Sequence, residues 1–473
     1  MGNIKVKTIV PLVQIVLTQV ALFTLFWSTC YGVSPEASFS WNGKILAFLI
    51  IFALAFIAGQ LCKLVRVPTL VGMLLAGISL SNLTEIQLDP SLSSTARDLA
   101  LGVILLRAGI SLDPNALRKL SWVCLRLAFT PCVVEAVVLA IGTHLLLHLP
   151  FLWCMVVGFV CTATSPAVIV PIMINMQDLG YGIDKGIPTL VIGGSSVDDI
   201  AAITCFEIFL SLAMSTSTSI TSTLLGPIEA VCGLILGITL GLLFWVLPPK
   251  CDADDIESRP FAGKVRFWLL LLTGLSFIYV TKRLNFESMG PLGVLSMSFV
   301  AALRWRQEGY IDAMIYSLKD IWFFCEIFLF SLIGYEVKFS SLKMHTILWS
   351  LVCLVIGLIA RTITSIGIVA GAGLTLKEHL FIGVSWLPKG TVQAAIGSIP
   401  LELARAKNDE TMISYGLTIL TFAVLSIIIS APLGAFLIKY SGPKLLVKSK
   451  KQQNDNFDGI SLESVPHISK AHF

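Results

Sequence analysis

Two adjacent aspartates, Asp198 and Asp199, interrupt an apolar stretch as long as a membrane helix. Successive residues of an α-helix point about 100° apart, so one carboxylate can face a cavity while the other faces a helix partner. Burial and mutual repulsion both favour the protonated form of at least one of them. Carboxylate oxygens also suit hard cations. A proton and a cation can therefore compete for one carboxylate, which is an exchange mechanism; an acidic helix cap is the alternative, but apolar sequence flanks both sides.

Two further charges, Glu135 and Arg361, each stand alone at the centre of an apolar segment. An unpaired charge at membrane depth is costly, so we expect these two residues to pair. Arg361 could instead meet Asp198, and that alternative stays open. A structural role for the pair is as plausible as a direct role in transport.

Four other charges are weaker candidates. We expect Arg107 to stabilise helix ends that face it, and Lys389 to offset the negative carbonyl ends of an interrupted helix. Glu207 follows Asp199 by two helical turns, and Glu326 interrupts an aromatic run; each faces either a wet funnel or the membrane interface. No Walker, Rossmann or nucleophile-elbow motif is evident, so we predict a transporter without a cofactor rather than an enzyme.

Two apolar segments, 151–175 and 378–400, are broken at their middle by polar residues and a proline. The breaks read Thr-Ala-Thr-Ser-Pro at 162–166 and Leu-Pro-Lys-Gly-Thr at 387–391. Irregular backbone at membrane depth survives only where it is buried in protein or lines a cavity. A pair of interrupted helices at matching places in two halves is typical of inverted-repeat transporters. Ordinary proline kinks are the alternative.

The composition predicts an all-α polytopic membrane protein. Hydrophobic residues make up 56% of the chain and charged residues 13%, whereas a soluble domain is about a quarter charged. The net charge of +4 is too small to indicate a nucleic-acid partner, and the 11 cysteines lack metal-binding spacing. About fourteen segments approach the length of a membrane helix. They run roughly over 8–28, 43–62, 67–82, 94–112, 120–147, 151–175, 186–213, 222–246, 265–282, 290–304, 318–336, 346–372, 378–400 and 414–438.

Lysines and arginines gather in alternate loops, which places both termini in the cytoplasm by the positive-inside rule. The apolar run after Lys5 and Lys7 exceeds the usual core of a signal peptide, so we interpret it as the first membrane helix. Residues 1–440 are then one transmembrane domain, and 441–473 a disordered cytoplasmic tail.

Seven sequence strings carry a resemblance to a known family. They are LLRAGISLDPNALRKL (105–120), RLAFTPCVVEA (126–136), TSPAVIVP (164–171), YGIDKGIPTL (181–190), SVDDIAAIT (196–204), LIGYEV (332–337) and SWLPKGTVQAAIGS (385–398). With them the chain resembles the cation/proton antiporter superfamily, most closely the animal NHA-type sodium/proton antiporters, family 9B of the sodium/hydrogen exchangers.

The resemblance implies a homodimer with the NhaA-like inverted-repeat fold, in which a dimerisation scaffold flanks a mobile six-helix core. It identifies Asp199 as the cation-binding aspartate, holding Na⁺ or Li⁺, and Asp198 as the neighbour that meets a basic residue. Arg361 stands where bacterial electrogenic relatives place a lysine, with Glu135 as its partner. Ser165 and Thr164 match the first crossover, and Lys389 matches the second.

These features predict a Na⁺ or Li⁺/proton antiporter that works by alternating access. Exchange is expected to be electroneutral, because an arginine stays charged and Arg361 cannot carry a second proton. The expected partners are Na⁺, Li⁺, H⁺, the lipid bilayer and a second copy of the chain. We expect the plasma membrane or an endosomal membrane as its location, ahead of the mitochondrion.

Charged residues inside apolar segments also occur in proteins of three other functions. An ion channel usually needs a continuous polar path or filter, which the sequence does not display. An intramembrane aspartyl protease needs aspartates from two different helices, and Asp198 and Asp199 are adjacent. An anion-coupled proton carrier on the same fold stays open, because Arg361 and Arg107 could attract an anion.

Overall fold

The computed structural model describes residues 24, 25, 28, 44–65, 67–111, 122–214, 220–248, 258–284, 286, 289–341 and 344–449. Across those residues the regular structure is helical, apart from one isolated antiparallel bridge between Tyr181 and Lys448. The expected first membrane helix, 8–28, lies almost wholly outside the described residues.

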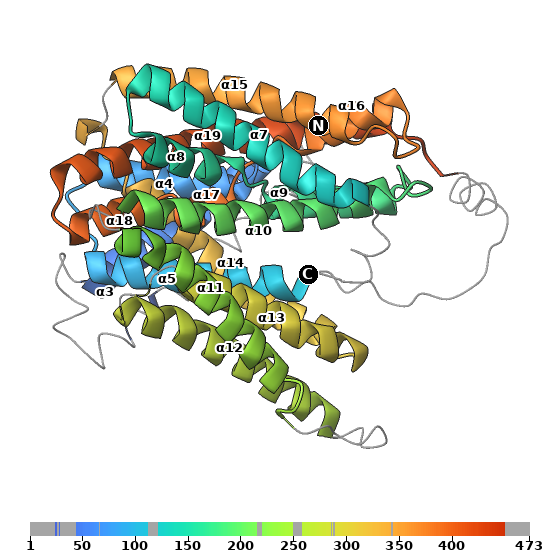
Figure 1. Ribbon diagram of the computed structural model, residues 1–473, viewed down its shortest axis with the longest axis horizontal. Helices are drawn as coiled ribbons and strands as arrows, with labels where there is room; N and C mark the ends of the chain where they lie inside the picture. Colours follow the sequence, from blue (N-terminus) through green and yellow to red (C-terminus); the bar gives the residue numbers. More distant parts are fainter. Residues whose placement is uncertain are drawn as a thin grey trace.

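One set of helices, here called the panel, forms one side of the molecule (Figure 1). Its members are α3 (Lys44–Leu64), α4 (Thr69–Leu83), α5 (Pro90–Ser111), α11 (Ile220–Leu243), α12 (Ser258–Arg283), α13 (Met289–Gln307) and α14 (Ile311–Tyr335). A short 3₁₀ turn, Phe339–Ser341, follows α14. In Figure 1, α11, α12 and α13 run obliquely below the other helices.

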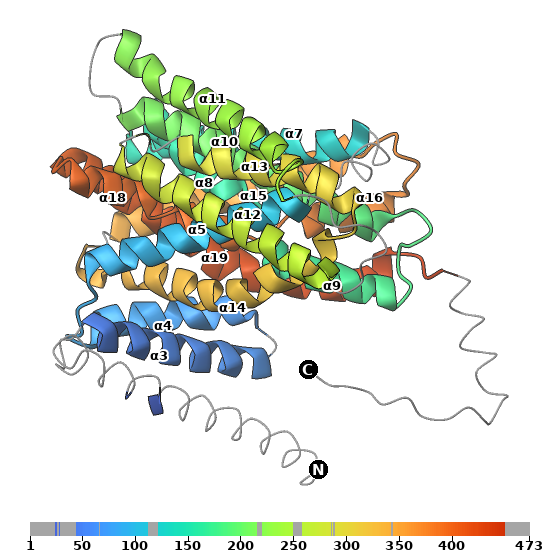
Figure 2. The same ribbon diagram turned by 90° about the horizontal axis from the view of Figure 1, so that it is seen from below.

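The remaining helices form the second set, here called the core bundle. They are α7 (Trp122–Leu147), α8 (Phe151–Thr162), α9 (Pro166–Asp178), α10 (Ile187–Met214), α15 (Met344–Ile368), α16 (Leu376–Ser385), α17 (Thr391–Ile396), α18 (Ile399–Ala406) and α19 (Glu410–Leu445). Helices α7 and α15 pack side by side, as do α8 and α19, so residues far apart in the chain become neighbours (Figures 1 and 2).

Several helices have the length and composition of membrane spans. Six meet both criteria within the described residues: Ile45–Leu64, Trp122–Leu147, Phe151–Asp178, Ala262–Arg283, Met344–Ile368 and Glu410–Leu445. In lipid every backbone polar group must be satisfied within the protein, which a helix achieves by itself. Helix α4 is shorter, and α10 carries Asp198, Asp199 and Glu207, which lower its mean hydropathy. The chain is a multi-pass membrane protein.

Helices α11 and α13 pack closely along a line of glycines. Gly233, Gly237 and Gly241 recur every fourth residue and so lie on one face of α11. A Cβ at Gly233 or Gly237 would collide with the backbone carbonyl of Met289 or Gly293 on α13. Small residues at this spacing let two helix backbones approach without the hydrophobic driving force that water supplies.

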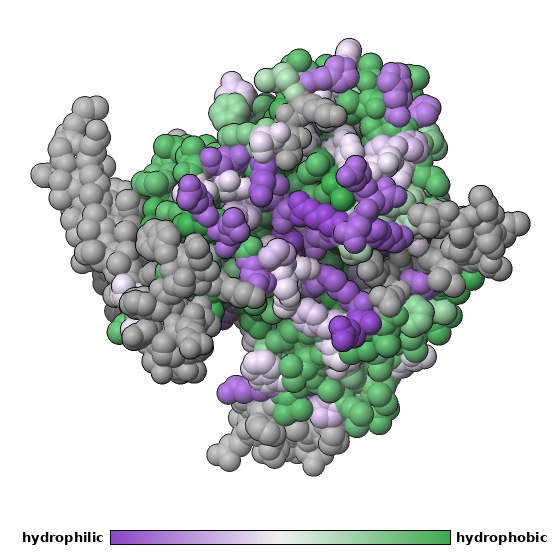
Figure 3. Space-filling model, turned by 90° about the vertical axis from the view of Figure 1, so that its left-hand side faces the viewer, coloured by the Kyte–Doolittle hydropathy of each residue, from purple (hydrophilic) through white to green (hydrophobic). Residues whose placement is uncertain are grey.

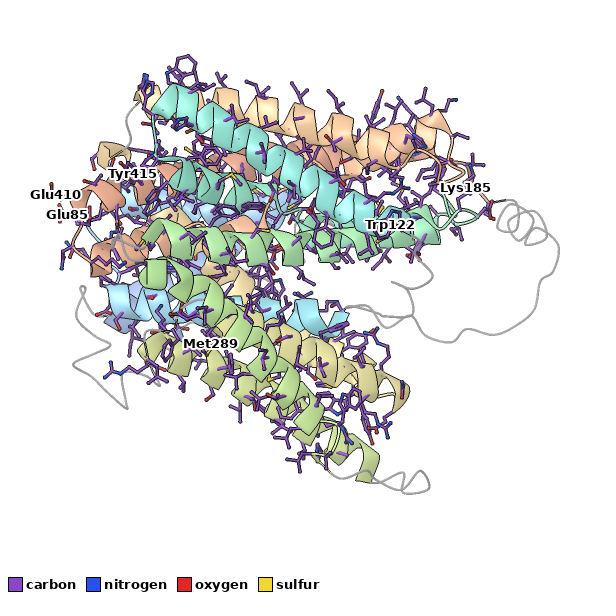
Figure 4. The ribbon with its side chains drawn as sticks, in the orientation of Figure 1. Glu85, Trp122, Lys185, Met289, Glu410 and Tyr415 are labelled. Carbon is purple, nitrogen blue, oxygen red and sulfur yellow. The ribbon has the colours of Figure 1, made fainter. Side chains whose placement is uncertain are left out.

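The two ends of the helices are named here after labelled residues (Figure 4). Glu85, Glu410 and Tyr415 lie at one end, the Glu85 end, and Trp122 and Lys185 lie at the other, the Lys185 end.

The C-terminal helix extends beyond the point where we expected a disordered tail to begin. Helix α19 continues past residue 441 to Leu445, and the next residues lie along the loop between α9 and α10. The Gly182 N–H donates to the Val447 carbonyl at 2.9 Å, and the Ser449 N–H donates to the Gly180 carbonyl at 2.8 Å. The ordered chain therefore reaches residue 449, and residues 450–473 lie outside the described part.

Candidate functional site

Two parts of the core bundle lose helical structure at the middle of an apolar segment. Helix α8 ends at Thr162 and α9 begins at Pro166, while α16 ends at Ser385 and α17 begins at Thr391. The second break is part of a longer irregular stretch than the sequence suggests, because the predicted segment 378–400 divides into α16, α17 and the start of α18.

The two non-helical segments touch each other. The Ser165 N–H donates to the Pro388 carbonyl at 2.9 Å, a backbone bond between residues more than two hundred positions apart. Gly390 lies so close that a Cβ there would be 2.6 Å from Ser165 Oγ. A glycine at this position lets the two backbones meet.

Side chains satisfy the backbone groups that the interruptions leave without helical partners. Lys389 Nζ donates to the Thr162 carbonyl at the end of α8, at 2.6 Å. Gln393 Nε2 donates to the Ala163 carbonyl at 2.7 Å, and its Oε1 accepts the Gly390 N–H at 2.7 Å. One lysine and one glutamine thus fix the carbonyl end of α8 to the start of α17.

Arg361 is the centre of a fully buried charge cluster. Its Nη1 lies 2.8 Å from Glu135 Oε2, and its Nη2 lies 2.7 Å from Asp198 Oδ2. Its Nε donates to the Trp386 carbonyl at 3.0 Å, so all three guanidinium nitrogens are bonded within the protein. Both pairings that the sequence left open occur together, and Lys389 Nζ also reaches Glu135 Oε2 at 2.7 Å.

The two adjacent aspartates have different surroundings. Asp198 Oδ2 accepts the Thr164 N–H at 2.9 Å in addition to the Arg361 guanidinium. Asp199 is also buried, yet it makes no ion pair within the described residues, and its Oδ1 has no hydrogen-bond partner. The helical rotation between neighbours therefore gives one carboxylate a fixed cationic partner and leaves the other without one.

Among the residues that the structure describes, five buried oxygens around the interruptions lack a hydrogen-bond partner. They are Thr164 Oγ1, Ser165 Oγ, Asp198 Oδ1, Asp199 Oδ1 and Thr391 Oγ1. Hydroxyl and carboxylate oxygens are ligands for hard cations such as Na⁺. No group of three or more His, Cys, Asp or Glu side chains suited to a metal ion occurs in the part of the chain that the structure describes. In its chemistry this set of oxygens suits a hard monovalent cation.

Arg107 makes no contact with this cluster among the described residues, and its expected role in stabilising helix ends stays a prediction. It lies on α5 with its guanidinium 5.3 Å from the centre of the Trp322 ring on α14, and it interacts electrostatically with Glu326. Both helices belong to the panel. Glu207 is buried on α10 beyond the aspartates.

Two residues of the site were missed from the sequence, although both lie in a motif that was recognised. Gln393 follows Gly390 by three positions, which is the spacing of a capping residue at a helix start, and this signal could have identified it. Thr391 opens α17 directly after the break.

The sequence matches the family model described as "Sodium/hydrogen exchanger, transmembrane" over residues 50–439. It is 38% identical to sodium/hydrogen exchanger 9B2 of Homo sapiens over 451 residues, which cover 93% of this chain and 82% of that protein. It is 35% identical to sodium/hydrogen exchanger 9B1 of Homo sapiens over 446 residues, covering 92% and 84%.

The fold is similar to that of the sodium proton antiporter MjNhaP1 from Methanocaldococcus jannaschii at pH 8. The TM-score is 0.67 at 17% sequence identity, with 85% of this chain and 99% of that chain covered. The sequence matches decide the family, and the structural match agrees with them in fold. The chain therefore belongs to the sodium/hydrogen exchanger family, within its 9B group.

Proposed function

We propose that this protein exchanges Na⁺ or Li⁺ for a proton at Asp199. The observation that carries the proposal is the difference between the two aspartates: Asp198 is bonded to Arg361 at 2.7 Å, whereas Asp199 is buried and has no ion-pair partner among the described residues. A buried carboxylate without a fixed cation is stabilised by binding one. A proton and a hard cation then compete for the same oxygens.

The charge balance of the cluster supports exchange of one cation for one proton. Asp198, Asp199 and Glu135 supply three negative charges when ionised, and Arg361 and Lys389 supply two positive charges. The sum is −1, and one bound proton or one Na⁺ brings it to zero. Because a net charge in a medium of low dielectric constant is costly, the cluster favours one monovalent cation at a time.

We propose alternating access as the way in which Asp199 reaches both sides of the membrane. Each half of the core bundle contains a long helix, an interrupted span and a second long helix. The first half is α7, then α8 with α9, then α10. The second half is α15, then α16 with α17, then α19. We propose that the halves are inverted repeats whose interruptions cross at the site. The core bundle then moves against the panel, and the panel of a second copy completes a homodimer.

The Lys185 end is the proposed cytoplasmic side. Lysines and arginines at that end include Lys185, Arg266 and Arg304, and the positive-inside rule assigns such an end to the cytoplasm.

Anion coupling receives less support than cation binding. Each guanidinium nitrogen of Arg361 already bonds a protein oxygen, and Lys389 Nζ bonds both Glu135 and the Thr162 carbonyl. Arg107 lies against Trp322 in the panel. An anion would have to displace these bonds, whereas the oxygens that could receive a cation, such as Asp199 Oδ1 and Ser165 Oγ, have no hydrogen-bond partner among the described residues.

Proton flux in proteoliposomes tests the proposal. Imposed Na⁺ or Li⁺ gradients should drive proton movement, and a Cl⁻ gradient should not. Asp199→Asn should abolish the flux while the protein keeps its thermal stability, because Asp199 holds no ion pair that folding depends on. Normal Na⁺-driven flux in Asp199→Asn would contradict the assignment.

A further inference from the structure

Four charged residues lie across the seam between the panel and the core bundle at the Glu85 end. Arg97 Nε on α5 lies 2.9 Å from Glu402 Oε1 on α18, and Arg405 Nη1 on α18 lies 2.8 Å from Glu336 Oε2 at the end of α14. Each of these two ion pairs joins a panel residue to a core-bundle residue. Arg97 also lies 3.4 Å from Glu336 within the panel, which links the pairs into one network.

Glu402 is held by donors from both sides of the seam. Ser94 of α5 donates to its Oε2 at 3.0 Å, and Ser398, directly before α18, donates to its Oε1 at 2.9 Å. The side chain of Arg97 is 5% exposed and that of Glu402 is 20% exposed, so solvent and salt screen this pair less than a surface pair. Figure 3 views the molecule from the Glu85 end, and hydrophilic residues gather across the middle of that face.

Helix α18 is tied to the elements that carry the ion site. It follows α17 after two residues, and α17 starts at the second interruption. Lys407, just beyond α18, donates to the Met214 carbonyl at the end of α10 at 2.8 Å, and α10 carries Asp199. Any displacement of Asp199 relative to the panel at this end therefore pulls α18 away from α5 and α14.

The ion pairs Lys185–Glu378 and Arg266–Glu308 at the Lys185 end are arranged differently. Lys185 and Glu378 lie 2.7 Å apart within the core bundle. Arg266 and Glu308 lie 3.3 Å apart within the panel. These pairs stiffen one bundle each, whereas the pairs at the Glu85 end join the two bundles.

We infer that the Arg97–Glu402 and Arg405–Glu336 pairs form a latch that closes the Glu85 end and opens once in every transport cycle. The inference rests on the proposed function, because only a carrier whose core moves against its panel needs such a latch. Ion pairs suit this role because each charged partner regains water when the seam opens, and this rehydration offsets part of the attraction that is lost. Weakening the latch shifts the population toward the state open at the Glu85 end.

A reversible cross-link tests whether the seam opens. In the variant Ser94→Cys with Glu402→Cys, a short, reducible bis-methanethiosulfonate reagent should join α5 to α18. Na⁺-driven proton flux should fall to background after cross-linking and return after reduction. The control is Asp98→Cys with Lys282→Cys, which replaces a pair 2.6 Å apart at the same end but within the panel, and it should keep its flux.

Undiminished flux in the cross-linked Ser94→Cys, Glu402→Cys protein would overturn the latch. Absence of flux in the wild-type protein would instead contradict the proposed function.

Hydrogen–deuterium exchange tests the latch without a flux measurement, and therefore also applies if the wild-type protein shows no flux or if a cysteine variant does not fold. Glu402→Gln should raise amide exchange in residues 399–406 at least about fivefold, the low end of typical couplings between sites. Glu308→Gln, which removes an ion pair within the panel at the Lys185 end, should leave it unchanged. Equal protection of 399–406 in Glu402→Gln and wild type would also overturn the latch.

Discussion

The guanidinium of Arg361 holds Asp198 at 2.7 Å and leaves its neighbour Asp199 without an ion pair among the described residues. The division follows from helix geometry, since adjacent side chains on α10 point in different directions. Arg361 also pairs with Glu135 at 2.8 Å, so its charge is shared between two carboxylates on different helices. Residues that hold the cluster together should therefore affect stability, and residues that bind the cation should affect transport.

Ser165→Ala should weaken Na⁺ binding without destabilising the protein. Ser165 Oγ is buried and has no hydrogen-bond partner, so its removal breaks no bond within the protein. A hydroxyl that contacts a charged group contributes roughly 1.5–3 kcal/mol, which corresponds to an increase of roughly tenfold to a hundredfold in apparent KM for Na⁺. Initial rates of proton flux at graded Na⁺ concentrations measure it.

Ser350→Ala is the matched control for that variant. Ser350 on α15 is also buried, and its Oγ also lacks a partner. Its removal should leave both the KM for Na⁺ and the thermal unfolding temperature unchanged or slightly improved. Equal KM values for Ser165→Ala and Ser350→Ala would remove Ser165 from the ion site.

Gly390→Ala should block transport by separating the two interruptions. The added Cβ would lie 2.6 Å from Ser165 Oγ and 3.2 Å from Ser165 Cβ, so the Ser165 hydroxyl must rotate away and the two segments must separate by a few tenths of an ångström. Overpacking of this kind costs about 1–3 kcal/mol, so the protein should still fold. Gly367→Ala on α15 is the control, because its Cβ meets nothing within 4 Å. Wild-type flux in Gly390→Ala would show that the close contact is not required.

The Glu135–Lys389 pair should show strong coupling in thermal unfolding in detergent. Glu135 Oε2 lies 2.7 Å from Lys389 Nζ, and both side chains are buried. Glu135→Gln or Lys389→Gln alone leaves one buried charge of the cluster uncompensated, although Arg361 still contacts Glu135 in the second variant, and should destabilise by up to about 3–5 kcal/mol. The double variant keeps the Arg361–Asp198 pair balanced, so it should recover part of that loss. Additive losses would mean that the two residues are not coupled.

The sequence predicts the helices better than their interruptions, because apolar length shows a membrane span but not where its backbone turns. Segment 151–175 corresponds to α8 and α9, and the polar run at 162–166 marks the gap between them. In the predicted segment 378–400 the backbone leaves the helix from Trp386 to Gly390, one residue earlier than the predicted break, and a second interruption separates α17 from the start of α18. The short helix α18 carries both latch residues of the core bundle and was not foreseen.

The sequence alone does not determine which charged residues of the cluster pair with each other. The cost of an unpaired charge predicts that Arg361 finds an acid, but not that it finds Glu135 and Asp198 together. Lys389 was expected near carbonyl ends, and it does bond the Thr162 carbonyl at 2.6 Å. Arg107 lies against Trp322 in the panel, and apolar periodicity could not tell whether its helix belongs to the panel or the core bundle.

The central claim, that one cation exchanges for one proton at Asp199, is tested most directly by Na⁺-driven proton flux in proteoliposomes whose membrane potential is clamped with K⁺ and valinomycin. With Arg361 permanently charged and bonded to Asp198 and Glu135, only one carboxylate alternates between a proton and Na⁺. The flux should then be independent of the imposed potential. A flux that depends on voltage and reverses at a ratio of two protons to one Na⁺ would contradict the account, because a second group would then have to carry a proton.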